Sequence, residues 1–146
     1  MGWTPATGTR NLIERDGLNQ AVKELTRLLA GEITGSDLCH EPWRSVLLSI
    51  GDGHAERLMN DPSGARLAYW PRSWAARAFA YAGDSAAAPA LLSALADPQW
   101  RVRMTAIQTL GRLEVEGVTD EFVSALADEH PRVRAAAAVA LRRLGA

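Results

Sequence analysis

The residues of this chain best suited to contacting a partner are tryptophans and arginines between positions 66 and 112, where six arginines stand against two aspartates. An indole face attracts a guanidinium group by a cation–π interaction, and tryptophan and arginine dominate the binding energy of many interfaces. The pattern fits an acidic protein surface or a phosphate backbone, while a solvated helix face with structural tryptophan packing is the alternative. The residues that we predict to contact a partner are Trp70, Arg72, Arg77, Trp100, Arg101, Gln108, Arg112 and Arg143.

Catalytic and metal-binding patterns are missing from the sequence. His54 and Glu56 match half of a zinc deaminase signature, but the other half needs two cysteines and Cys39 is the only one. Cys39 and His40 are adjacent in sequence, whereas a catalytic pair must meet in space. The histidines, with His130 as the third, lack metal-ligand spacing, and no phosphate loop or nucleophile elbow occurs. We predict a protein that is not an enzyme and binds no metal or cofactor.

An internal repeat organises the second half of the chain. The segment Ala90–Asp97 resembles Glu121–Asp128 at an offset of 31 residues, and the same offset carries Arg101–Arg103 onto Arg132–Arg134. Each copy has apolar residues three and four apart and a proline break, which predicts two helices. The second helices carry stripes predicted to face the core: Val102, Ala106, Leu110 and Leu113, then Val133, Ala137, Leu141 and Leu144. Arg101, Gln108 and Arg112, which we call the arginine row, lie on the face of the helix opposite the core stripe.

Upstream the pattern is weaker. Aligning Ala82-Gly83 with Leu110-Gly111 shifts the register to 28 residues, so that Trp74 takes a core position and Arg72–Ala82 forms the second helix of a degenerate repeat. We predict Ala55–Asn60 as its partner helix. Further helices are expected from Leu18 to Leu29 and from Pro42, the latter ending at Gly51–Gly53.

Composition narrows the class of protein. The 146 residues fit one domain, and a formal net charge of -1 argues against a generally basic nucleic-acid binder. The single cysteine rules out an internal disulfide, and no segment approaches the roughly 20 apolar residues of a membrane span. We therefore expect a cytoplasmic protein. Abundant alanine and arginine with one lysine, Lys23, suggest a GC-rich bacterial genome.

The segment Leu95–Pro98, followed by Val102-Arg103, Ala106 and Leu110-Gly111, resembles the HEAT-like repeats named after phycobilin lyases. The resemblance implies an all-α, right-handed α-solenoid of antiparallel helix pairs, with about six or seven helices and the second helices on the concave side. The predicted organisation is a single domain, 1–146, made of irregular helices over 1–60, a degenerate repeat over 61–84, and repeats over 87–115 and 118–146.

The resemblance also implies binding or scaffolding rather than catalysis, with ion pairs between the turn aspartates and the helix arginines: Asp97, Asp128, Arg103 and Arg134. The first hypothesis is a protein-interaction module that holds a partner on the concave face. The alternatives are nucleic-acid binding through the arginine row and an enzyme-accessory or ligand-handling role of the phycobilin-lyase type. Because Ala135–Ala140 leaves the last helix little polar surface, a homodimer through the C-terminal repeat is a further hypothesis.

Overall fold

The computed structural model describes residues 2–61, 63–83 and 85–145, and this part of the chain folds into α-helices and short 3-10 helices without strands. The α-helices are α1 (Pro5–Asp16), α2 (Leu18–Leu29), α3 (Trp43–Met59), α4 (Trp70–Ala82), α5 (Ala88–Ala94), α6 (Trp100–Arg112), α7 (Thr119–Ala125) and α8 (Pro131–Arg143). The 3-10 helices are η1 (Gly35–Cys39), η2 (Ala65–Ala68) and η3 (Ser85–Ala87). The predicted all-α class is confirmed, with eight α-helices in the described residues rather than six or seven.

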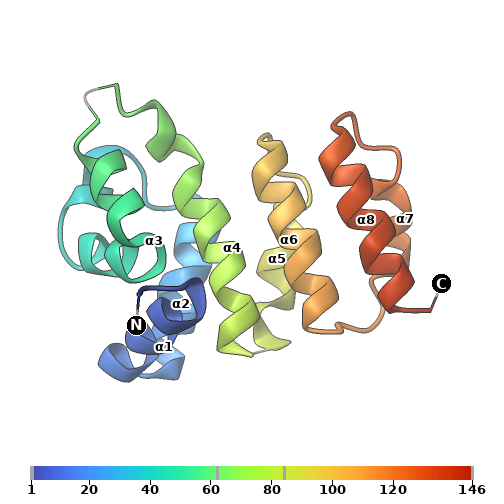
Figure 1. The fold of residues 1–146 in the computed structure, drawn as a ribbon, viewed down its shortest axis with the longest axis horizontal. Coiled ribbons are helices and arrows are strands. Elements are labelled where there is room, and N and C mark those ends of the chain that lie inside the picture. The colour runs from blue at the N-terminus through green and yellow to red at the C-terminus, as the bar shows by residue number, and fades with distance from the viewer. Residues whose placement is uncertain (1, 62, 84, 146) are drawn as a thin grey trace.

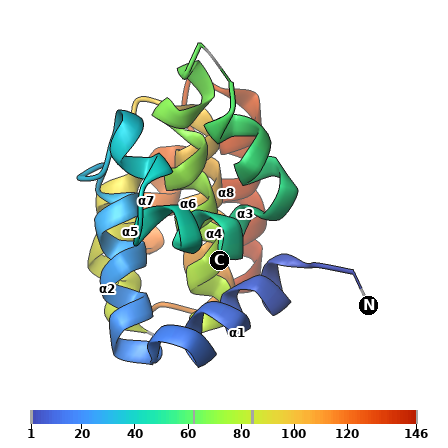
Figure 2. The same ribbon diagram turned by 90° about the vertical axis from the view of Figure 1, so that its left-hand side faces the viewer.

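The helices stack as two layers of a solenoid. Helices α4, α6 and α8 stand side by side in one layer, and α2, α5 and α7 form the layer behind them (Figure 1, Figure 2). Contacts run from α4 to α6 and from α6 to α8 within the first layer, and from α5 to α6 and from α7 to α8 between the layers. We call the exposed side of α4, α6 and α8 the second-helix face.

The helix that pairs with α4 across the layers is α2, so the predicted partner, Ala55–Asn60, is wrong. Helix α2 packs along α4 and buries Ala21, Leu25 and Leu28, whereas the predicted segment buries only Ala55 and Leu58. Because α2 has the wider apolar stripe, packing it against α4 removes more apolar surface from water, so α2 is the partner of α4. The chain between α2 and α4 carries η1, α3 and η2 as an insertion at the N-terminal end, where α1 and α3 pack together (Figure 2).

The register of the degenerate repeat is 31 residues, like that of the other two, and the predicted 28 is wrong. Gly83, Glu114 and Gly145 have φ of 64°, 52° and 75°, and each comes just after the end of a second helix. This left-handed residue is a common way for a helix to end. The sequence alignment placed Gly83 on Gly111, but Gly111 lies inside α6, where an added Cβ would stand 3.3 Å from Ala140. Gly83 therefore ends a helix, whereas Gly111 allows α6 and α8 to approach closely.

Most of the predicted core stripe is buried. Val102, Ala106 and Leu110 are fully enclosed in α6, and α8 repeats the pattern with Val133 and Ala137. Leu113, at the end of the first stripe, is half-buried and packs against the core. The prediction is wrong for Leu144, which follows the final turn of α8 and is 36% exposed. Val123 in α7 and Leu126, which follows the last residue of α7, are exposed. Trp74 is buried as predicted.

Helix α3 is kinked at the predicted stop, Gly51–Gly53, and then continues. Asp52 has φ 49° and ψ -134°, which lies outside the helical region. The carbonyls just before the kink bond to side chains, because Trp3 Nε1 donates to Ser49 O at 3.1 Å and Arg77 Nη2 donates to Ile50 O at 2.7 Å. Loss of regular helical bonding at a kink is normally made good in this way. The kink thus ties α1 and α4 to α3.

Helices α1 and α3 approach closely at Gly8, so Gly8→Ala is expected to lower the free energy of unfolding by about 1–3 kcal/mol. An added Cβ would overlap the carbonyl oxygen of Ser49 and the Trp3 ring, which would push the two helices apart. Gly53→Ala is the matched control, because nothing lies within 4 Å of the place its methyl group would take and alanine is the better helix former. Urea unfolding measures both variants. A Gly8→Ala loss no larger than that of Gly53→Ala would contradict the close approach.

Candidate functional site

A ladder of ion pairs joins successive repeats at one edge of the stack. Arg72 donates to Asp97 through Nε and Nη2 at 2.7 and 3.0 Å, and Arg103 donates to Asp128 in the same way at 2.9 and 3.0 Å. Each arginine thus binds the turn aspartate of the following repeat with two parallel bonds. Hydrogen bonds from Arg103 lower the pKa of the Asp128 carboxyl below its usual value. Arg72 is therefore held by Asp97 inside the stack, and the prediction that it contacts a partner is withdrawn.

The last arginine at this position, Arg134, has no aspartate partner among the described residues. Arg103 also donates to the carbonyl oxygens of Asp97 and Pro98, and Arg134 repeats these contacts with the carbonyls of Asp128 and Glu129. Among the described residues, no carboxylate forms an ion pair with Arg134. In both ion pairs of the ladder, the aspartate therefore belongs to the repeat that follows the arginine's own repeat.

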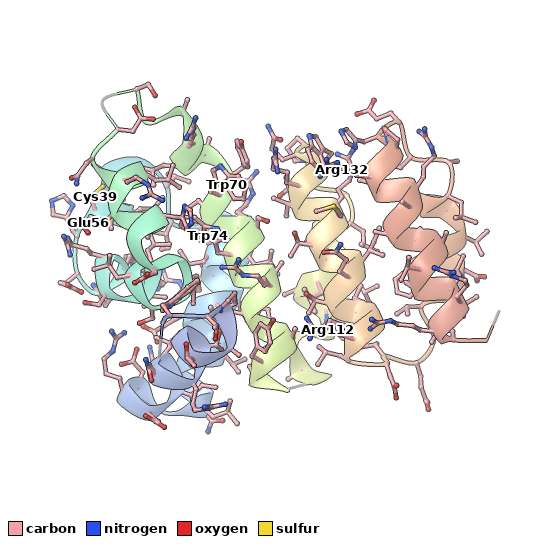
Figure 3. All side chains as sticks on the ribbon, viewed as in Figure 1. Cys39, Glu56, Trp70, Trp74, Arg112 and Arg132 are labelled. Atoms are coloured by element: carbon pink, nitrogen blue, oxygen red, sulfur yellow. The ribbon has the colours of Figure 1, made fainter. Side chains whose placement is uncertain are left out.

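A second ladder, of aromatic rings and guanidinium groups, crosses the start of α4, α6 and α8. Arg101 lies between Trp70 and Trp100, with its Cζ 5.0 and 4.4 Å from the two ring centroids. Trp100 stacks on His130 at 3.9 Å with an interplanar angle of 7°, and Trp70 packs on Trp74 at 6.0 Å. Trp70 and Trp100 therefore do not stack on each other, because Arg101 separates them. Figure 3 marks Trp70 and Trp74 beside α4 and Arg132 at the start of α8.

Two grooves on the second-helix face collect most of the remaining candidates. The groove between α4 and α6 has a volume of about 180 Å³, and the groove between α6 and α8 about 390 Å³. Both are lined by Gln108 and Arg112, so they adjoin. The candidates that line one groove or both are Trp70, Arg77, Arg101, Gln108, Arg112 and Arg143. In the part of the chain that the structure describes, no aspartate or glutamate lines them.

A larger hollow of about 570 Å³ lies between the end of α3 and α4, and we call it the α3–α4 pocket. It is lined by His54, Arg57, Leu58, Asp61, Arg66, Trp70, Trp74 and Arg77. Sequence reasoning did not associate His54 or Arg57 with the arginine row. The local pattern carries no signal for this association, since the hollow exists only because the inserted helix packs beside α4.

Residues with catalytic potential are kept apart. Cys39 Sγ contacts the carbonyl of Met59 at 3.9 Å, and His40 Nδ1 lies 2.7 Å from the carbonyl of Ser36, so each side chain faces backbone rather than the other. Within the described ranges, no group of three or more His, Cys, Asp or Glu could hold a metal ion. Nor does any described helix combine the length and the apolar character needed to cross a bilayer.

Comparison with known proteins agrees with this repeat architecture. A comparison with curated proteins found no match. A family model described as HEAT repeats matches residues 56–142, which span α4 to α8 and include both ladders. The matched region covers more than half of the chain and contains the helix pairs α5–α6 and α7–α8, the 31-residue register and the ion pairs between repeats. This chain is therefore a member of the HEAT repeat family.

Proposed function

We propose that this protein is an interaction module that holds an acidic segment of a partner protein in the two adjoining grooves of its second-helix face. HEAT repeats are generally protein-interaction scaffolds. The observation that carries the proposal is the lining of the grooves: Arg77, Arg101, Arg112 and Arg143 contribute guanidinium groups, and among the described residues no carboxylate lines the grooves to neutralise them. Complementary charge selects a partner and speeds its association.

The shape of the grooves favours a segment over a flat domain surface. The hollows lie between neighbouring helices and adjoin at Gln108 and Arg112, so a chain laid across α4, α6 and α8 can fill both. The α6–α8 groove has a small-residue floor, formed by Gly111, Ala136 and Ala140. Apolar side chains of the segment would lie on this floor while its carboxylates reach the arginines at the rim. Arg112, marked in Figure 3, stands at the junction.

The test is an anisotropy titration with a fluorescein-labelled peptide of about 15 residues rich in glutamate and leucine. The double variant Arg112→Gln/Arg143→Gln is expected to weaken binding about tenfold or more, since each lost ionic contact at an interface is worth about 1 kcal/mol or more. Arg142→Gln is the matched control, because Arg142 is an exposed neighbour on α8 that lines neither groove. It is expected to change the affinity less than twofold.

Two outcomes would contradict the proposal. One is equal weakening by Arg142→Gln, because the peptide would then respond only to the overall charge. The other is binding of duplex DNA at low salt that is tighter than binding of the peptide and falls steeply as salt rises, because that result favours phosphate contacts.

A further inference from the structure

The α3–α4 pocket has an excess of positive charge. Arg57, Arg66 and Arg77 line it with one carboxylate, Asp61, and Asp61 already accepts hydrogen bonds from the backbone N–H and the hydroxyl of Ser63, both at 3.0 Å. Among the described residues, none of the three arginines forms an ion pair. An oxyanion in the pocket would therefore meet several guanidinium groups that have no carboxylate partner.

His54 lies at the rim of the pocket. Its Nδ1 lies 2.8 Å from Arg57 Nη2, and because a guanidinium group only donates, Nδ1 accepts in this contact. The same contact orients the guanidinium group of Arg57.

Arg77 is the most enclosed of the pocket arginines, and its position is fixed by the fold. Its Nη2 donates to Ile50 O at 2.7 Å, at the kink of α3, and its Cζ stands 5.8 Å from the centroid of the Trp3 ring. Burial lowers the pKa of this guanidinium group, which remains charged at any physiological pH. Arg77 is half-buried, and a partly desolvated cation without a carboxylate partner is less stable than a paired one, so an anionic ligand would stabilise it.

One wall of the pocket is aromatic. Trp70 and Trp74 pack together with an interplanar angle of 29°, and both rings border the pocket as well as the α4–α6 groove. Leu58 adds an aliphatic surface on the α3 side. Flat ring systems bind well beside indoles, and about 570 Å³ lies within the usual size range of small-molecule sites.

We propose that the α3–α4 pocket binds a small-molecule phosphate monoester whose phosphoryl group sits on a flat ring-bearing body, as in a nucleoside 5′-monophosphate. A phosphate monoester carries close to two negative charges at neutral pH, which matches three arginines opposed by one aspartate. The planar guanidinium fork pairs with phosphate oxygens through two parallel bonds. The body lies along Trp70 and Trp74. Arg57 and Arg66 line neither groove, so this site goes beyond the proposed partner-binding role.

The test is calorimetric titration of the full chain with adenosine 5′-monophosphate, adenosine and inorganic phosphate. We expect the monophosphate to bind and adenosine and inorganic phosphate each to bind at least about tenfold more weakly, since each lacks one half of the recognition. The double variant Arg57→Gln/Arg66→Gln is expected to weaken the monophosphate about tenfold or more. Both side chains are exposed, so the variant should fold, and thermal unfolding checks this.

The matched control is Arg44→Gln. Arg44 is an exposed arginine of α3, the helix that carries Arg57, and it lines no hollow described above, so this variant should change the affinity less than twofold. The acidic peptide distinguishes the two proposals, because Arg57→Gln/Arg66→Gln should leave peptide binding unchanged. The pocket proposal is overturned if the monophosphate does not bind, if adenosine binds equally well, or if Arg44→Gln weakens binding as much as the double variant. Inorganic phosphate that binds as tightly as the monophosphate would overturn the role of the aromatic wall.

Discussion

Arg103→Met is expected to lower the free energy of unfolding by about 2–3 kcal/mol, below the range for a fully buried ion pair because Asp128 is half-buried. The Arg103 side chain is buried between α6 and the next repeat, where it makes two hydrogen bonds to Asp128 and two more to backbone carbonyls. Methionine fills a similar volume but donates no hydrogen bond. It would leave Asp128 and the carbonyls of Asp97 and Pro98 without these donors, in a place where water has little access.

The matched control for this prediction is Arg134→Met, at the same position one repeat later. Arg134 is exposed and bonds only to backbone carbonyls, so we expect a loss of about 1 kcal/mol or less. Urea unfolding followed by circular dichroism gives both values. Equal losses in the two variants would mean that the ion pair with Asp128 adds nothing beyond the backbone contacts. A double-mutant cycle with Asp128→Asn would then measure a coupling energy near zero.

The stability of the wild-type protein is expected to fall by about 2.5 kcal/mol between pH 5 and pH 8 because of Glu24. This side chain is 4% exposed, and its Oε1 has no hydrogen-bond partner among the residues that the structure describes. Burial, and then the interaction with the neighbouring Asp16, raise the pKa of Glu24 to about 7. The folded state therefore keeps a proton that the unfolded chain releases near pH 4.5. Stability decreases as pH rises through this window, at no more than about 1.4 kcal/mol per pH unit.

Glu24→Gln should remove most of this pH dependence, because an amide stays neutral throughout the range. The variant is expected to exceed the wild type in stability at pH 8 and to approach it at pH 5. Glu14→Gln, at an exposed position of α1, is the control and should leave the pH profile unchanged. The lowered pKa of Asp16, caused first by its hydrogen bond from Arg15, affects stability only below about pH 4 and so does not mask the effect. Equal slopes for wild type and Glu24→Gln between pH 5 and 8 would contradict the assignment.

The N-terminal half of the chain changes what the repeats can bind. In the regular repeats, a short turn joins the two helices of a pair, and their outer surface is a row of shallow grooves. Between α2 and α4 the connection is long enough to form α3, whose kink places the Ile50 carbonyl on Arg77. The inserted helix adds a second wall beside Trp70 and Trp74. The repeats thus provide the partner-binding face, and the insertion provides the α3–α4 pocket.

The sequence alone was enough to predict the all-α class, the helix pairs of the last two repeats and most of their core. These features follow from local spacing, because residues three and four apart share a helix face and a proline after a polar turn starts a new helix. The resemblance to HEAT-like repeats implied structural ion pairs for Asp97, Asp128, Arg103 and Arg134. Asp97, Asp128 and Arg103 form such pairs, whereas Arg134 forms none among the described residues, and Arg72, predicted to contact a partner, pairs with Asp97 instead. The grooves collect six of the eight residues predicted to contact a partner.

Only the tertiary structure decided which elements meet across long stretches of chain. Sequence could not show that α2 rather than Ala55–Asn60 pairs with α4, because the choice depends on the total area buried by each alternative. The pairing of Arg72 with Asp97 and the place of Arg101 between two tryptophans likewise depend on the spacing of neighbouring repeats. The α3–α4 pocket is the clearest case. Its arginines come from α3, η2 and α4, and a kink at one residue brings them together.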